Sequence, residues 1–419
     1  MSDVTAGPKY AFIVSRFPKL TETFILRELR GLADRGLDFE LFALIHETSA
    51  QLQPDAAELD ARAHYPSLRS AEPWSALWFW LRRDPRRVAT AARIAVSTSR
   101  QSREVMLRLP VVFLISLAMA RRMERLDIDR VHAHWATYPT LAALIIKQLT
   151  DIPYSFTGHA QDIFIERGGL AAKVAGADLV VTCTDHGRDV ISGQVTAEDA
   201  AKVVLLHHGT DLESFALLPL RQPRTGALRL ICVASLEEMK GHRYLLDACR
   251  ILVDRGIDLE LELIGDGPLR AELEAKVEVL GLGSRIRFLG RRSSTEVRAR
   301  LEWADVFVLA SMVMPNGLMD GIPNVLVEAL AIGRPSVSTA LPGIVELVTD
   351  GVEGLLCDPQ DANGLAERLQ RLHDEPDLAA ALVRAGRARV EREHNAEHTL
   401  DRLYRLLTEL PTGHGPSVD

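Results

Sequence analysis

Short apolar runs alternate with amphipathic helical stretches along the 419-residue chain, and this alternation limits the folds it can adopt. Such a rhythm is typical of βαβ units, which build parallel sheets. In the first half we predict helices over 22–35 and 141–149. The predicted strands there are 10–14, 39–44, 130–133, 154–157, 179–182 and 203–205.

The same rhythm restarts after a segment with two prolines. A helix is predicted over 242–255, and the strands are 228–234, 259–264, 286–289, 306–309, 335–339 and 355–357. We therefore expect an α/β protein with a Rossmann-like domain over 1–212, a linker over 213–227, a second Rossmann-like domain over 228–390, and a C-terminal helix and tail over 391–419. Open α/β sheets bind ligands beyond the carboxyl ends of their strands, so a cleft between the two domains is the expected site.

Composition argues against several classes of protein. A formal net charge of -8 disfavours non-specific nucleic-acid binding. Four cysteines lie far apart without a C-x-x-C pair, which excludes a disulfide scaffold and a zinc ribbon and indicates a reducing compartment. The longest apolar run, 109–120, has 12 residues, whereas a bilayer span needs about 20. With no signal-peptide pattern at residues 1–8, we expect a cytoplasmic protein.

Residues 320–335, DGIPNVLVEALAIGRP, are the segment best suited to ligand chemistry. A turn at 321–324 precedes a predicted helix over 325–332. The N-terminus of a helix presents free N–H groups and binds phosphate without a basic side chain. Asp320 before the helix and Glu328 within it are placed to approach one ligand from two directions. The alternative is an acidic turn and an ordinary glutamate on a helix face.

Histidines form a second set of candidates. His159 follows a strand and begins a turn, which suits a ligand contact, although a capping or core histidine is the alternative. His132 and His134 are two residues apart on a strand and share a face. That spacing is compatible with a metal, but no third ligand is evident, so no metal is expected.

Several motifs resemble those of the retaining glycosyltransferases of family four, which have the GT-B fold. Asp320 and Glu328 resemble the acidic pair of that family, in which the first acid is more often glutamate. The other matching motifs are Lys240-Gly241-His242, 263–268, 288–290 and 351–356. In the first half, 15–18 with 21–25, 132–135 and 154–162 resemble enzymes of colanic-acid-type and other exopolysaccharide assembly.

The resemblance implies roles for individual residues. Asp320 with its neighbouring backbone holds the donor sugar, Glu328 holds the ribose, and His159 contacts the sugar near the reacting carbon. Lys240 is the counter-charge for the departing diphosphate. The further donor-side residues are Gly321, Ile322, Pro323, Asn324, Gly265, Ser235 and Arg291, and the acceptor-side residues are Arg16, Phe17 and His134.

One position departs from the family pattern. Five residues before the lysine the family usually has an arginine, and this chain has Ser235. Arg16, Arg291 or Arg292 could supply the missing charge. If none of them does, either Lys240 and the helix N-terminus are enough to stabilise the departing diphosphate, or the transferase activity is weak.

Residues 74–125 form a basic and aromatic segment. It holds eleven arginines against three acidic residues, a local charge of +8 that leaves -16 for the remainder, and three of the five tryptophans. This mixture suits an anionic membrane surface. The alternative is a helical insertion with solvated arginines and internally packed tryptophans.

The sequence thus predicts a retaining glycosyltransferase that needs no cofactor or metal. It would move a hexosyl unit from a nucleotide diphosphate sugar to a saccharide or polyprenyl-diphosphate-linked acceptor, in exopolysaccharide or cell-surface polysaccharide biosynthesis. We expect it in the cytoplasm, with peripheral contact at the inner face of the plasma membrane. A GT-B sugar-nucleotide epimerase is one alternative. A non-catalytic assembly subunit, suggested by Ser235, is the other.

Overall fold

The computed structural model describes residues 7–18, 23–47, 54–100, 102–165, 168–219 and 226–410. The chain divides into unit 1, which ends at Leu206 and resumes at Leu400, and unit 2, from His207 to Thr399. The first boundary precedes the expected one at 212 because Thr210 pairs with the last part of unit 2. Its N–H donates to His394 O at 2.7 Å, and its carbonyl accepts from Ala396 N at 3.1 Å. Positions 21–22 of the N-terminal motif, 220–225 of the expected linker and 411–419 of the tail lie outside the described residues.

Unit 1 is built on a six-stranded parallel sheet with the order β2-β1-β3-β4-β5-β6. The strands are β1 Tyr10–Phe17, β2 Phe39–His46, β3 Arg130–His134, β4 Tyr154–Gly158, β5 Leu179–Thr182 and β6 Val203–Leu205. The first two are longer than predicted because their pairing continues to Phe17 and His46. The alternation that predicted them is therefore confirmed.

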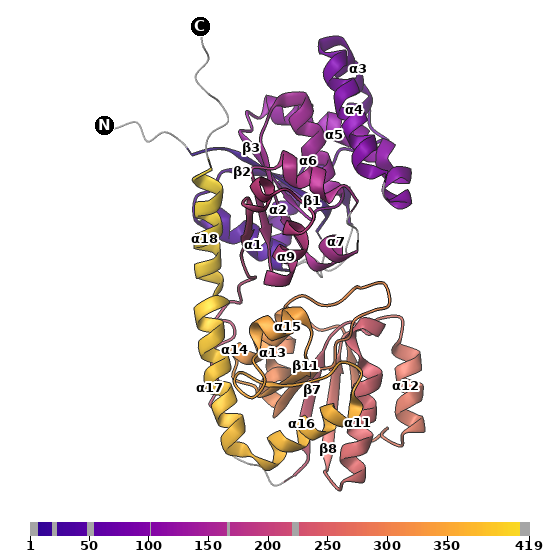
Figure 1. The fold of residues 1–419 in the computed structure, drawn as a ribbon, viewed down its shortest axis with the longest axis vertical. Helices are drawn as coiled ribbons and strands as arrows, with labels where there is room; N and C mark the ends of the chain where they lie inside the picture. Colours follow the sequence, from indigo (N-terminus) through magenta and orange to yellow (C-terminus); the bar gives the residue numbers. More distant parts are fainter. Residues whose placement is uncertain are drawn as a thin grey trace, which may run out of the picture. The chain divides into compact units, whose positions relative to one another are not determined.

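Helices cover this sheet (Figure 1). They are α1 Thr23–Asp34, α2 Pro54–Arg62, α3 Glu72–Arg83, α4 Pro85–Ser99, α5 Arg103–Arg125, α6 Tyr138–Thr150, α7 Ala160–Phe164, α8 Leu170–Gly176, α9 Asp185–Ser192 and α10 Ala197–Ala200. The final helix, α18 Ala396–Thr408, returns to unit 1, as the family resemblance implies. Its Leu403 and Leu407 are buried in the core that includes Tyr10, whose hydroxyl donates to Leu407 O at 2.5 Å.

Unit 2 has a second six-stranded parallel sheet, with the order β12-β11-β10-β7-β8-β9. Its strands are β7 Leu228–Val233, β8 Leu259–Ile264, β9 Ile286–Gly290, β10 Val306–Leu309, β11 Ser336–Thr339 and β12 Leu355–Cys357. Its helices are η1 Glu238–Lys240, α11 His242–Asp254, α12 Arg270–Val279, α13 Ser294–Trp303, α14 Asn324–Ala331, α15 Pro342–Leu347, α16 Ala362–Asp374 and α17 Pro376–Glu393. The predicted strands agree closely because buried parallel strands are continuous apolar runs.

The basic and aromatic segment folds as the helices α3, α4 and α5. Trp80 is 1% exposed, and its Nε1 donates to Leu117 O at 3.0 Å. Trp74 and Trp78 are 50% and 64% exposed and lie on one face of α3 because they are four residues apart. Internal packing therefore holds for Trp80, whereas Trp74 and Trp78 are exposed, and their contact with a membrane stays a prediction. Among the described helices, none combines the length and the apolar character needed to cross a bilayer.

The α18 helix should contribute strongly to the stability of unit 1. Replacing Leu407, which is fully buried, with alanine should lower the free energy of unfolding by about 3 kcal/mol, because the cavity is lined by β1 and α1 side chains that cannot collapse into it. Leu107→Ala is the matched control, since Leu107 is 82% exposed and should change stability by less than about 0.5 kcal/mol. Urea unfolding followed by circular dichroism measures both. Equal losses would contradict the packing role of α18.

Candidate functional site

The strand order of unit 2 reverses between β7 and β10, and the loops after these two strands carry the main donor-side candidates. β8 and β9 lie on one side of β7, whereas β11 and β12 lie beyond β10. Connections that run in opposite directions leave a crevice at the carboxyl ends of the strands, which is where open α/β sheets bind ligands. Lys240 follows β7 and Asp320 follows β10.

The structure pairs Lys240 and Asp320 with each other. Lys240 Nζ lies 2.6 Å from Asp320 Oδ1, and Ser311 Oγ donates to the second oxygen, Oδ2, at 2.6 Å. The two charged side chains are only 17% and 11% exposed. Charged hydrogen bonds in a partly desolvated setting hold both groups in place more firmly than a surface pair would. The sequence assigned separate roles to these residues and did not predict the contact.

A glycine lets the lysine loop lie against the end of β10. Gly241 has a φ of +64°, and a Cβ there would lie 1.8 Å from Ala310 O. Met312 N also donates to Met239 O at 2.8 Å. Any residue with a side chain at position 241 would push the loop away, so the Gly241 of the K-G-H motif is what seats Lys240 beside Asp320.

A second close backbone contact brings Ser235 and Gly265 together. Gly265 has a φ of +139°, and a Cβ there would lie 1.9 Å from Ala234 O. Leu236 N donates to Asp266 O at 3.1 Å across the same two loops. These expected donor-side residues therefore line the carboxyl ends of β7 and β8. Arg291 and Arg292 are exposed and follow β9, the outermost strand on that side, and Arg292 lies 3.4 Å from Glu296.

The helix α14 starts where the sequence predicted. Pro323 is its N-cap residue and makes no side-chain cap, and Leu326 N donates to Pro323 O at 2.9 Å. The first-turn donors left for a ligand are the N–H groups of Asn324 and Val325. Asn324 is exposed, whereas Gly321, Ile322 and Glu328 are half-buried. Gly343 packs on the preceding turn, since a Cβ there would lie 2.4 Å from the carbonyl carbon of Gly321.

His159 in unit 1 is the N-cap residue of α7, at the end of β4. It is 7% exposed, and its ring lies 4.4 Å from that of Trp135 and 5.1 Å from that of Phe24. Asp162, which is buried, accepts from His159 N at 2.7 Å and from Ala136 N. Burial raises the pKa of Asp162 to about 7, against the opposing effect of these backbone donors. His159 is therefore fixed by a capping box and can still face Trp135.

The three expected acceptor-side residues differ in exposure. Phe17 is 5% exposed and belongs to the core of unit 1, and His134 is fully buried with its Nε2 3.1 Å from Glu28 Oε1. Arg16 is exposed. Burial of Phe17 and His134 leaves Arg16 as the side chain of the three that can reach a ligand directly.

A cluster of Glu28, His132 and His134 has the composition of a metal site. However, His132 Nδ1 lies 2.8 Å from Ser155 Oγ and its Nε2 lies 3.0 Å from Thr157 Oγ1. Both ring nitrogens are thus engaged by hydroxyls, which makes His132 a poor ligand. Burial lowers the pKa of His132 to about 3, so the ring is neutral at physiological pH. The absence of a metal stays a prediction.

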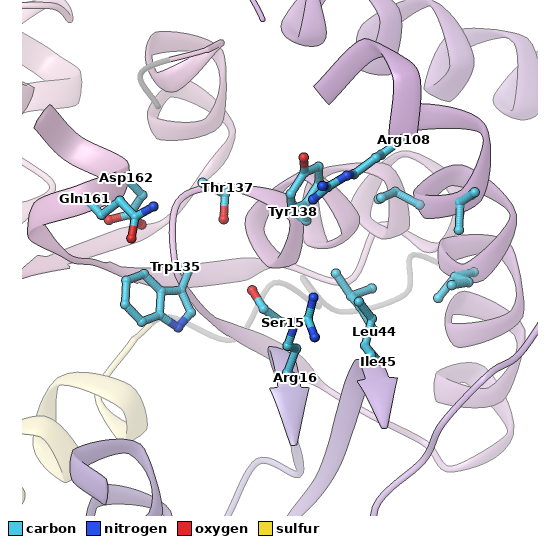
Figure 2. A pocket seen from close by; sticks show the side chains of 13 residues that line it. Ser15, Arg16, Leu44, Ile45, Arg108, Trp135, Thr137, Tyr138, Gln161 and Asp162 are labelled. Atoms are coloured by element: carbon cyan, nitrogen blue, oxygen red, sulfur yellow. The ribbon is translucent and has the colours of Figure 1, made fainter. Parts of the chain in front are cut away.

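Unit 1 contains a cavity of about 290 Å³ at the carboxyl ends of its strands (Figure 2). Its strand order reverses between β1 and β3, and Ser15, Arg16 and Trp135 line the cavity from the ends of these two strands. Arg108 on α5 lines it as well, although no sequence pattern predicted that this residue lies near a site. In both units some candidate residues thus lie where the strand order reverses, whereas His159 follows β4 and Arg291 follows β9.

Known proteins match both units of the chain. The sequence profile described as Glycosyltransferase Family 4 matches residues 21–214, and that described as Glycosyl transferases group 1 matches residues 227–375. WcaL of Escherichia coli K12, assigned to colanic acid biosynthesis, is 26% identical over 96% of this chain and 100% of its own length. The amylovoran biosynthesis glycosyltransferase AmsK of Erwinia amylovora is 36% identical over 50% of this chain and 52% of its own.

Solved structures share the fold. A glycosyltransferase from Rickettsia africae has a TM-score of 0.71 at 14% identity, covering 97% of this chain and 100% of its own. HepE of Anabaena, solved in complex with UDP, has a TM-score of 0.70 at 17% identity, covering 96% and 100%. These likenesses confirm the predicted GT-B fold. With both of its domains matched, the chain belongs to the family 4 glycosyltransferases and is a glycosyltransferase enzyme.

Proposed function

We propose that this glycosyltransferase moves a hexosyl unit, with retention of configuration, from a nucleotide diphosphate sugar to a lipid-linked saccharide in exopolysaccharide synthesis. The observation that carries the proposal is the Lys240–Asp320 pair beside the open N-terminus of α14. Support for the pathway comes from the names of WcaL and AmsK, and support for a nucleotide donor comes from UDP in the structure of HepE.

The hydrogen-bonding capacity of the pair suits a diphosphate sugar. An ammonium has three N–H donors, and Asp320 accepts one from Lys240, which leaves two for phosphate oxygens. A carboxylate has about four acceptor positions, of which Lys240 and Ser311 occupy two in Asp320. Asp320 can therefore hold Lys240 and accept from a sugar hydroxyl at once, and the first-turn amides of α14 add further donors for the sugar or the phosphates.

In the proposed step, the bond between C1 of the hexose and the diphosphate oxygen breaks. The acceptor hydroxyl oxygen forms the new bond to C1 on the same face, and its proton passes to the departing diphosphate. Lys240 and α14 stabilise the negative charge that grows on the diphosphate, so the step needs no metal. His159 orients the donor sugar, and Glu328 binds the ribose.

Ser235 leaves Lys240 as the main cation of this loop. Arg291 and Arg292 follow the outermost strand β9, and Arg292 is paired with Glu296, so neither contacts the Lys240–Asp320 pair. We propose that Lys240 and α14 suffice for the leaving group. The relatives named above give no support to an epimerase or to a non-catalytic subunit.

We further propose that α3 and α5 touch an anionic membrane at the cytoplasmic face. Trp74 and Trp78 are exposed together with Leu107. The exposed arginines of this segment are Arg82, Arg83, Arg86, Arg93, Arg100, Arg103, Arg108 and Arg125. Exposed aromatic rings and arginines on the same segment are the combination that binds an anionic interface.

Replacing Lys240 tests the leaving-group role. Lys240→Gln should lower kcat by about 100-fold to 1,000-fold, because one positioned donor to the developing anion is lost. Release of nucleotide diphosphate during sugar transfer measures the rate. Lys276→Gln is the matched control, since Lys276 forms a comparable pair with Asp247, at 2.7 Å, away from the switch point. A loss below tenfold in a folded Lys240→Gln protein would contradict the assignment.

Nucleotide binding can be tested without an acceptor. One compound among UDP, GDP, ADP and dTDP should stabilise the protein by about 2.7 kcal/mol at 100 times its Kd, because it binds only the folded state. Thermal unfolding with and without EDTA measures the shift. No response to any of the four would contradict the transferase proposal. A response only with a divalent cation would contradict its metal-free form.

Membrane contact predicts a defect in vesicle binding. The double variant Trp74→Ser, Trp78→Ser should reduce partitioning onto phosphatidylglycerol vesicles by about tenfold, because two exposed rings no longer enter the interface. Val279→Ser, which removes an 87% exposed valine from unit 2, is the control. Co-sedimentation measures the bound fraction. Wild-type binding that is equal on neutral phosphatidylcholine vesicles, or unchanged in the double variant, would refute the contact.

A further inference from the structure

The cavity of unit 1 has three chemically distinct walls. Trp135, Thr137 and Gln161 form an aromatic and polar wall at the ends of β3 and β4. The cationic part is Arg16 and Arg108, and the apolar wall consists of Leu44, Ile45, Val111, Val112 and Ile115. Figure 2 shows Trp135 and Gln161 at one side, Leu44 and Ile45 at the other, and Arg16 between them. Such a succession matches a ligand that is itself part sugar, part anion and part hydrocarbon.

The backbone at Trp135 is held in an unfavourable conformation. Its φ is +79°, which is uncommon for a residue with a bulky side chain. Asp162 accepts from the N–H of the next residue, Ala136, and Lys173 Nζ donates to the carbonyl of Ala136 at 2.6 Å. Both charged residues are nearly fully buried, at 1% and 3% exposure. Strain that is maintained by hydrogen bonds with two buried side chains indicates a functional demand on the position of the indole.

The cationic part of the cavity can accept an anion. Within the described part of the chain, Arg16 makes no ion pair or hydrogen bond. Arg108 pairs with Glu104 at 3.1 Å, but both side chains are more than half exposed, so that pair is weak. Asp162 also lines the cavity, yet its two oxygens accept from backbone amides. The net charge presented to a ligand is positive.

The apolar wall reaches the surface. Ile45 and Val111 are 46% and 42% exposed, although both line the cavity. Leu107, 82% exposed, precedes Val111 by four residues and lies on the same face of α5. A hydrocarbon chain that leaves the cavity along Val111 would therefore continue over apolar surface.

We propose that this cavity binds the junction between sugar and lipid in the acceptor. The sugar ring stacks on Trp135, Arg16 and Arg108 bind the diphosphate, and the first isoprenoid units lie along Ile45, Val111 and Ile115. The inference rests on the proposed function, because it assumes a lipid-linked acceptor, and it assigns that acceptor to a defined site.

Titration calorimetry on the full chain tests the three walls separately. Farnesyl diphosphate should bind at least tenfold more tightly than inorganic pyrophosphate, because only the former covers the apolar wall. Its glucosyl ester should bind more tightly still. Arg16→Gln should weaken binding of both farnesyl compounds about tenfold. Trp135→Ala should abolish the advantage of the glucosyl ester, and Trp135→Phe should restore part of it. Arg384→Gln, an exposed arginine of α17 outside the site, should change neither affinity.

Three outcomes would overturn the inference. In the first, pyrophosphate binds as tightly as farnesyl diphosphate. In the second, Arg16→Gln leaves the affinity for the farnesyl compounds unchanged. In the third, methyl glucuronide binds and the farnesyl compounds do not, which would make the bound anion a sugar carboxylate. Thermal stabilisation of the protein by a nucleotide distinguishes failure of this inference from failure of the proposed function. A protein that responds to a nucleotide but not to farnesyl diphosphate is a transferase with a different acceptor site.

Discussion

The reversal of strand order in each parallel sheet is the constraint on which the rest of this structure depends. Parallel strands are joined by crossovers, and crossovers that run in opposite directions from one strand leave its carboxyl end uncovered. In unit 1 this point lies between β1 and β3, and in unit 2 it lies between β7 and β10. Candidate functional residues lie at both points, and the chemistry at each point depends on the loops that follow those strands.

The two units hold polar groups at the points of reversal by different interactions. In unit 2, Gly241 has a positive φ and lets the lysine loop lie so close to β10 that Lys240 meets Asp320. Gly265, also with a positive φ, lets the loop after β8 lie against Ala234. In unit 1, a buried carboxylate and a buried ammonium hold the backbone on either side of Ala136. The Lys240–Asp320 pair of unit 2 keeps hydrogen-bonding capacity for a ligand. The buried side chains of unit 1 donate to or accept from backbone groups, so they act only through the residues that they position.

Sequence patterns predicted the fold well because buried strands are continuous apolar runs, and they predicted the start of α14 from its proline and asparagine. They could not predict the contact between Lys240 and Asp320, which joins residues 80 apart through a strand order that the sequence does not state. The burial of His134 was missed for a related reason. Alternation on a strand indicates which side chains share a face, but a parallel sheet can be covered on both faces. Lys173 is a lone lysine in an apolar helix, and this was the sequence signal that could have predicted a buried polar group holding the backbone next to Trp135.

The helix α5 connects the separate parts of the proposed function through its geometry. One face buries Leu117 against Trp80, and another lines the cavity with Val111, Val112 and Ile115 and continues at its edge to the exposed Leu107. The same helix thus carries part of the surface proposed to meet the membrane and part of the cavity proposed to bind the acceptor. Because a lipid anchor keeps its diphosphate at the interface, a cavity on the interfacial helix lets the sugar enter without withdrawing the lipid from the bilayer. The two proposals together would account for the uneven distribution of the net charge of -8, because the cations of α3, α4 and α5 would meet an anionic surface and Arg108 would meet an anionic acceptor.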